Sequence, residues 1–214
     1  TKDLKLSGDC ISARHLLLFN DDVAIYKLHA NENMNCVYRN SHSDELFYIQ
    51  GGKGRFKSNF GDLDVIPGDY LLIPRGVIWK MDIEQDLSCL LLESTAPIET
   101  PSRYRNKFGQ LMEHSPYCER DIVLPELDIP ELIEDINLRV KLKHGIQDYT
   151  LKNNPFDIIG WDGCYYPWKL NINDFEPITG SIHQPPPVHQ TFQSSGFVVC
   201  SFVSRLFDYH PDSI

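Results

Sequence analysis

The chain has 214 residues, of which 42% are hydrophobic, and its 20 basic and 30 acidic residues give a net charge of −10. This length allows a substantial core in one domain or in two closely packed ones. The acidic balance argues against nucleic acid or an anionic membrane as partner, and no apolar run is as long as a membrane span, so we expect a soluble, cytoplasmic protein.

The first half of the chain shows the alternation of apolar and polar residues that is typical of strands. Two strands are predicted at residues 14–19 and 23–30, separated by an Asn-Asp-Asp turn. A longer stretch, residues 39–82, contains an alternating run, a turn at Gly51-Gly52 and a Pro-Gly turn before another short strand. It predicts the two halves of a small antiparallel β-barrel, and the apolar run at residues 87–93 predicts a buried strand that closes it.

These signals resemble the cupin superfamily. The first cupin motif is matched by Glu45, Tyr48 and Gly52, and the second by Gly61, Pro67, Gly68, Asp69, Ile73, Pro74 and Gly76. The resemblance implies a mainly all-β fold, a cupin-type antiparallel β-barrel or jelly roll with additional strands and short helices.

The cupin metal ligands are incomplete in this chain. Trp79 stands where the second motif has a histidine, which predicts a side chain that plugs the barrel. The histidines expected before Glu45 fall on Arg39 and Ser41, or on Tyr38 and Asn40 with the longer spacing. A non-haem iron site needs two imidazoles and a carboxylate on one face, so no metal ligand is assigned in this chain. An alternative is a single-cupin metal enzyme that uses His42, Asp44 and Glu45.

The chain divides in three by sequence. Residues 1–100 are expected to form the degenerate cupin barrel, and residues 101–155 a connecting arm and hairpin. The arm is expected to be solvated and acidic over residues 119–134, and the hairpin to pair residues 139–143 with 147–151. Residues 156–214 are expected to form strands leading into a catalytic cupin that lies outside this chain. Six cysteines without a C-x-x-C pair predict reduced, mostly buried thiols.

The stretch from Phe156 to Phe175 is dense in aromatic residues and glycine. It resembles a strand of the homogentisate 1,2-dioxygenase family, in its bacterial form, at Phe156, Asp157, Trp161, Gly163, Tyr165, Pro167, Lys169, Asn171 and Phe175. The resemblance implies a non-haem Fe(II) enzyme of tyrosine and phenylalanine catabolism that opens homogentisate with O2. The family's iron lies in the later cupin, so this chain is expected to be the scaffold part of a longer one and to bind no iron alone. The resemblance also implies a homo-oligomer, a trimer or hexamer.

Four residues are candidates for the active site. The resemblance places an acid/base histidine in the proline-rich loop, where His183 is the better match and His189 the alternative. Tyr166 and Lys169 are candidate substrate-binding residues, although Lys169 is expected more often to pair with Asp157 or Asp174. One of the two adjacent tyrosines is expected to face the core. A cupin that binds a small molecule without chemistry is the remaining alternative.

Overall fold

The structure is a computed structural model that describes residues 7–127, 129, 134–177 and 189–204. Its strands are β1 Arg14–Phe19, β2 Val23–Ala30, β3 Val37–Asn40, β4 Asp44–Ser58, β5 Gly61–Val65, β6 Asp69–Ile73, β7 Ile78–Ser94, β8 Ile122–Val123, β9 Ile136–Leu142, β10 Gly145–Leu151, β11 Trp168–Asn171, β12 Gln190–Gln193 and β13 Val198–Cys200. Three single-turn 3-10 helices are η1 Ser102–Tyr104, η2 Glu119–Asp121 and η3 Ile172–Asp174. The expected all-β, cupin-type fold with short helices is confirmed.

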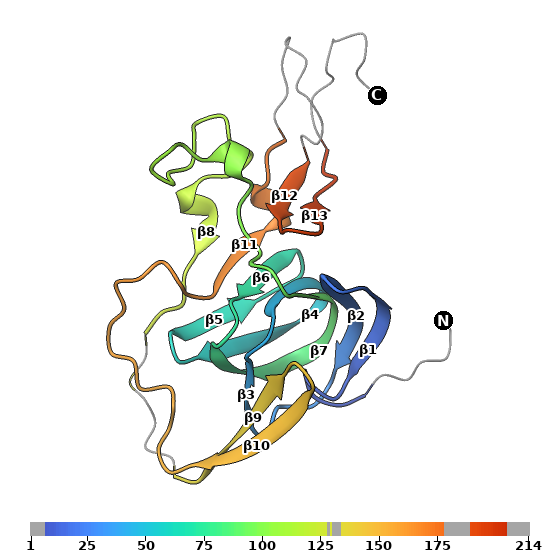
Figure 1. The fold of residues 1–214 in the computed structure, drawn as a ribbon, viewed down its shortest axis with the longest axis vertical. Helices are drawn as coiled ribbons and strands as arrows, with labels where there is room; N and C mark the ends of the chain where they lie inside the picture. Colours follow the sequence, from blue (N-terminus) through green and yellow to red (C-terminus); the bar gives the residue numbers. More distant parts are fainter. Residues whose placement is uncertain (1–6, 128, 130–133, 178–188, 205–214) are drawn as a thin grey trace.

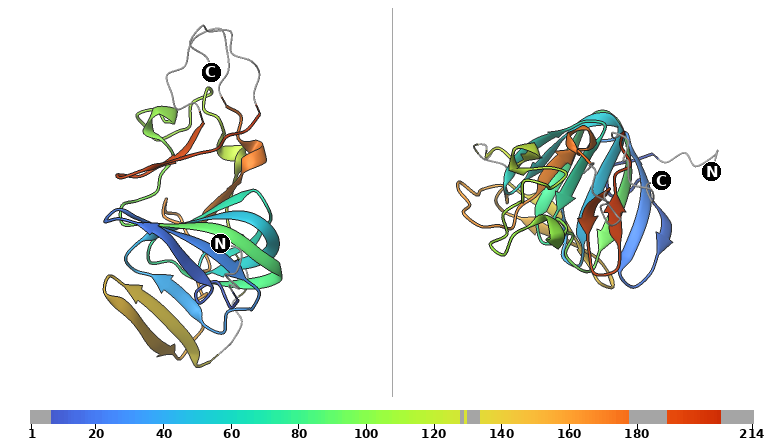
Figure 2. Two further views of the ribbon diagram at one scale, coloured as in Figure 1. Left: turned by 90° about the vertical axis from the view of Figure 1, so that its right-hand side faces the viewer. Right: turned by 90° about the horizontal axis from the view of Figure 1, so that it is seen from above.

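Eleven strands form one sheet that curls into the barrel in the middle of the molecule (Figure 1). Its order is β10-β9-β3-β7-β4-β6-β11-β8, with β2 also on β7, β1 on β2 and β5 on β4. All pairs are antiparallel except β3 with β9. The β9–β10 hairpin extends the sheet at one end of the molecule, and the small β12–β13 sheet lies beyond the other end (Figure 2). The β1, β2 and hairpin predictions are therefore confirmed.

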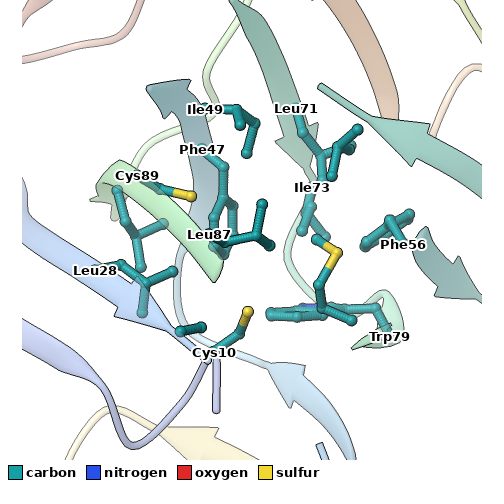
Figure 3. Close-up of a cluster of buried hydrophobic side chains, with 14 of the residues drawn as sticks. Cys10, Leu28, Phe47, Ile49, Phe56, Leu71, Ile73, Trp79, Leu87 and Cys89 are labelled. Atoms are coloured by element: carbon teal, nitrogen blue, oxygen red, sulfur yellow. The ribbon is translucent and has the colours of Figure 1, made fainter. Parts of the chain in front are cut away.

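A cluster of buried apolar side chains fills the centre of the barrel. Figure 3 shows its side chains pointing to a common centre, among them Phe47, Ile49, Phe56, Leu71, Ile73, Trp79 and Leu87, each 1% exposed or less. The Trp79 ring contacts Tyr38, Phe47 and Phe56, with centroids 5.4, 5.7 and 5.9 Å away. Trp79 fills the barrel as predicted.

The outer face of strands β4, β6 and β7 is also buried. Leu46, Leu72 and Leu92 alternate with interior residues along these strands and pack against Ile98 and Phe192. The segment after β7 and the β12–β13 sheet thus cover this face. Burial on both faces explains why β6 reads as a continuous apolar run in the sequence.

One expectation about the chain path is wrong. Gly51 and Gly52 do not turn the chain, because β4 continues through them as a bulge with register shifts against β7. Gly52 has a φ of 85°, and a Cβ there would lie 2.1 Å from the Asp86 carbonyl oxygen, so the bulge requires glycine. The acidic arm is exposed over most of its described residues, as expected, and it is also partly paired, since β8 lies on β11 and Glu126 exchanges backbone hydrogen bonds with Asp62.

The aromatic stretch that begins at Phe156 is mostly irregular, and only Trp168–Asn171 forms a strand, β11, beside β6. Cys10, Cys36 and Cys89 are buried, Cys164 is exposed, and all six cysteines are unpaired. Among the described residues, no helix is long and apolar enough to cross a membrane.

Candidate functional site

A cluster of charged and polar side chains lies buried among β1, β3, β4 and β7, and we name it the Arg14 cluster: Arg14, Asn40, Glu45, Trp79 and Glu93. Arg14 Nη1 donates to Glu45 Oε1 at 2.7 Å and to Glu93 Oε1 at 2.9 Å. Asn40 Nδ2 lies 3.4 and 3.3 Å from the same two oxygens. The other oxygen of Glu45 accepts from Trp79 Nε1 at 3.1 Å. Two carboxylates thus converge on one guanidinium nitrogen.

Burial and charge act in opposite directions on the two carboxylates. Burial raises the pKa of Glu45, which is 0% exposed, although Arg14 opposes that shift. Burial also acts to raise the pKa of Glu93, but Arg14 and Lys141 together hold it below its ordinary value. Lys141 forms an ion pair with Glu93 Oε2, and Tyr26 donates to the same oxygen at 3.1 Å. Two cations therefore balance the two carboxylates.

With Arg14 in place, the residues at the cupin metal position leave no room for a metal ion. The motif glutamate, Glu45, has both oxygens bonded to Arg14 and Trp79, and Tyr38 packs its ring on Trp79. A metal would have to displace a guanidinium that two carboxylates hold. Among the described residues, no three His, Cys, Asp or Glu side chains are close enough to share an ion.

The alternative ligand set of His42, Asp44 and Glu45 does not converge. Successive strand residues point to opposite faces, and Asp44 is bonded away from Glu45. Its Oδ1 accepts from Arg75 N at 3.0 Å and Nε at 3.1 Å, and its Oδ2 accepts from Ile98 N at 3.0 Å. Asp44 therefore fixes the chain after β6 and β7.

The two candidate acid/base histidines have different outcomes. His183 lies outside the described residues. His189 is half-buried, its Nδ1 lies 3.1 Å from the Ser201 carbonyl oxygen, and its ring packs on Phe202 with centroids 5.0 Å apart. A carbonyl oxygen only accepts, so Nδ1 carries the proton in this contact and neutral His189 keeps a lone pair on Nε2.

A buried hydroxyl network holds the small sheet that carries His189. Ser201 Oγ bonds to Thr191 Oγ1 and, at 3.0 Å, to the hydroxyl of Tyr70 on β6. Tyr117 donates to the Thr191 carbonyl oxygen at 2.9 Å. The bond from Ser201 to Tyr70 connects this sheet to β6 of the barrel, and Ser201 N donates to the His189 carbonyl oxygen at 2.8 Å, which ties His189 to the same network.

Lys169 and Tyr166 are not brought together with His189 by any contact of the structure. Lys169 Nζ donates to Asp69 Oδ2 at 2.9 Å and to the Asp64 carbonyl oxygen at 2.7 Å. Lys169 thus pairs with a carboxylate as expected, but with Asp69 rather than with Asp157 or Asp174. Tyr166 is half-buried and on no strand. Its neighbour Tyr165 is 46% exposed and donates to the Arg75 carbonyl oxygen, so the expectation that one of them faces the core is wrong.

A pocket of about 320 Å³ is lined by residues of β3, β4, β5, β7 and β9 and by residues 154–158. Its lining combines lysines and amides with apolar side chains and includes Met34, Lys57, Asn59, Lys80, Phe156 and Ile158. The lysines are not free charges, because Lys57 Nζ lies 3.0 Å and Lys80 Nζ 3.7 Å from Asp82. The pocket therefore suits a small molecule that is partly apolar.

Sequence reasoning missed Arg14, Asn40 and Glu93 as site residues. One signal was present: Glu93 ends an otherwise apolar run that is expected to be buried, and a buried carboxylate needs a cation. Nothing local indicates that Arg14, 79 positions away, supplies it.

The fold and the motif residues define a cupin-type barrel protein with a degenerate metal position. Residues 10–172 match the family model described as "Homogentisate 1,2-dioxygenase N-terminal". The chain therefore belongs to this family.

Two relatives match the chain over different lengths. The chain is 42% identical to the Saccharolobus solfataricus protein "Putative dioxygenase SSO1533". The alignment covers the whole of this chain and 56% of that protein. The chain is 29% identical to the homogentisate 1,2-dioxygenase of Nitrobacter hamburgensis, over 73% of this chain and 35% of that protein. It thus spans about half or less of the length of these relatives. A cupin-2 domain protein from Shewanella frigidimarina aligns with a TM-score of 0.35 at 15% identity, covering 38% of this chain and 78% of that one.

Proposed function

We propose that this chain is the non-iron scaffold part of a homogentisate 1,2-dioxygenase-like, ring-cleaving dioxygenase. The observation that carries the proposal is the family match over residues 10–172, in a chain whose own cupin metal position is filled by Arg14. In this proposal Fe(II) is bound by residues of the longer protein outside this chain. Homogentisate and O2 are the substrates, the protein acts in the cytoplasm, and it assembles as a homo-oligomer.

His183 stays the better match for the acid/base residue, and His189, its alternative, is the described residue through which this chain would contribute to the chemistry. Its Nδ1–H is bonded to the Ser201 carbonyl oxygen, so Nε2 is the atom that can accept a proton from a substrate hydroxyl and return it. The hydroxyl network around Ser201 and Thr191 would hold the imidazole in that orientation. In this chain Lys169 would serve the fold, because its ammonium is bound to Asp69.

The test compares the 214-residue chain with a protein extended to the full length of its relatives. Both are loaded with Fe(II) without O2 and desalted, and then assayed for iron by elemental analysis and for O2 uptake with homogentisate. We expect iron and turnover only in the extended protein. Stoichiometric iron and ring cleavage by the 214-residue chain would overturn the proposal.

A substitution tests the role of His189 in the extended protein. His189→Asn should lower kcat by about 10²-fold or more with iron content unchanged, since general acid–base catalysis contributes about that much. His144→Asn, in the exposed turn between β9 and β10, is the matched control and should leave kcat unchanged. Equal kcat in the two variants would remove His189 from the mechanism.

A second candidate function is the binding of a small molecule without chemistry, and the pocket beside Phe156 favours it. Calorimetric titration of the 214-residue chain with homogentisate should then show binding that Phe156→Ala weakens. Phe108→Ala removes a ring that is 76% exposed and outside the pocket, and it serves as the control. No binding heat with homogentisate would contradict this second function.

A further inference from the structure

The Arg14 cluster has the arrangement of a cation site. Glu45 Oε1 and Glu93 Oε1 lie 2.7 and 2.9 Å from the same atom, Arg14 Nη1, and the Asn40 amide stands beside both oxygens. The contributing residues come from four strands that are distant in the sequence. Carboxylate oxygens that converge on one point are typical ligands of hard cations, whereas Asn40 turns its Nδ2 to the carboxylates and its Oδ1 accepts from His42 N and Ser43 N.

The guanidinium is held in this position from several sides. Arg14 Nε donates to the Cys10 carbonyl oxygen at 2.8 Å, and the cation lies over the rings of Tyr38 and Phe47, 5.1 and 5.9 Å from their centroids. The side chain is only 8% exposed. Its Nη2 has no hydrogen-bond partner among the described residues. Both carboxylates therefore bind the same guanidinium nitrogen, Nη1, and neither forms a bidentate pair with Arg14.

We propose that the Arg14 guanidinium is the resident cation of this barrel. It occupies the place that a metal ion shares with the motif glutamate in a metal-binding cupin, neutralises Glu45 and Glu93, and so excludes a divalent metal ion from the barrel. The barrel keeps a cation site made by two carboxylates, and shortening Arg14 opens that site to a hard metal ion that completes its coordination with water. The proposal concerns this chain alone and is independent of any enzymatic activity.

Trp79 provides a direct readout of ion binding at this position. Its Nε1 lies 3.1 Å from Glu45 Oε2, so a Tb³⁺ ion bound by Glu45 would be excited through this indole and emit. The experiment titrates Tb³⁺ into the 214-residue chain and into Arg14→Ala, Arg14→Lys and Arg14→Ala/Glu45→Gln. Trp79→Phe in the Arg14→Ala background identifies the sensitising ring, because Trp161 and Trp168 remain.

The expected result is saturable emission, at one ion per chain, in Arg14→Ala only. It should be absent from wild type and from Arg14→Lys, which keeps a cation, and should be lost with Glu45→Gln or Trp79→Phe. Equal emission from wild type and Arg14→Ala would overturn the proposal, since acidic surface sites would be common to both. Folded Arg14→Ala without emission would overturn it as well.

The Arg14→Ala chain can be unstable because two buried carboxylates then lose their cation. If it is unfolded without metal, the proposal requires Ca²⁺ or Mn²⁺ to restore the β-sheet circular dichroism spectrum, with no such effect on Arg14→Ala/Glu45→Gln. An Arg14→Ala chain that stays unfolded with metal, while Arg14→Lys folds without it, would overturn the cation site.

Discussion

Replacing Lys169 by methionine separates a structural role of this residue from a substrate-binding one. Lys169 is 15% exposed and its partner Asp69 is 1% exposed, so the substitution leaves a buried carboxylate without its cation. Removing one partner of a buried ion pair costs about 3–5 kcal/mol. Asp69 keeps hydrogen bonds from Asn171 Nδ2 at 2.8 Å and Ile66 N at 3.0 Å, so we expect the lower end, about 3 kcal/mol. For a chain of this size that lowers Tm by about 6–12 °C.

The assay is urea unfolding followed by circular dichroism, with thermal unfolding alongside. Asp69→Asn/Lys169→Met removes the uncompensated charge and should recover part of the loss. Lys152→Met is the matched control, because Lys152 is 84% exposed and its bridge to Asp135 contributes at most about 1 kcal/mol. Unfolding of Lys169→Met at the urea concentration of Lys152→Met would refute the reasoning and make Lys169 a substrate ligand candidate again.

Three further outcomes follow from the backbone and from buried groups. Gly61→Ala should lower the free energy of unfolding, measured in urea, by about 2 kcal/mol or more. The φ of Gly61 is 111°, and a Cβ there would lie 2.2 Å from the Glu126 carbonyl oxygen. Gly145→Ala is the control, because a Cβ at Gly145 meets open space and should not lower the stability. A thiol reagent should modify exposed Cys164 in the native protein and reach buried Cys89 only after unfolding. Burial raises the pKa of Cys89 from 9.0 and that of Tyr26 from 10.0, both to about 12, so the folded state binds these protons more tightly than the unfolded state. Their stabilisation is complete below about pH 9 and is lost as pH rises towards about 12, which urea unfolding at increasing pH measures.

Local patterns predicted the parts of the fold that local chemistry determines. β1 and β2 have the predicted bounds because apolar alternation and an Asn-Asp-Asp turn mark them. The β-bulge at Gly51-Gly52 was read as a turn, because a glycine pair permits both and only pairing with β7 decides between them. Tertiary contacts also decide the site: Arg14 lies 31 and 79 positions from Glu45 and Glu93. Lys169 likewise prefers a carboxylate 100 positions away to the nearer Asp157 and Asp174.

The parallel pairing of β3 with β9 has a consequence for the order in which this protein folds. Val37 pairs with Leu138, about a hundred positions later, and the strands between them form the body of the barrel. Closing so long a loop costs entropy before its contacts can form, and sheets with such distant pairs fold slowly. During synthesis the β3 edge stays open until β9 has left the ribosome. Lys141, the second cation beside Glu93, lies on β9 and is synthesised just as late. Until then Arg14 is the cation that balances both carboxylates in the nascent barrel.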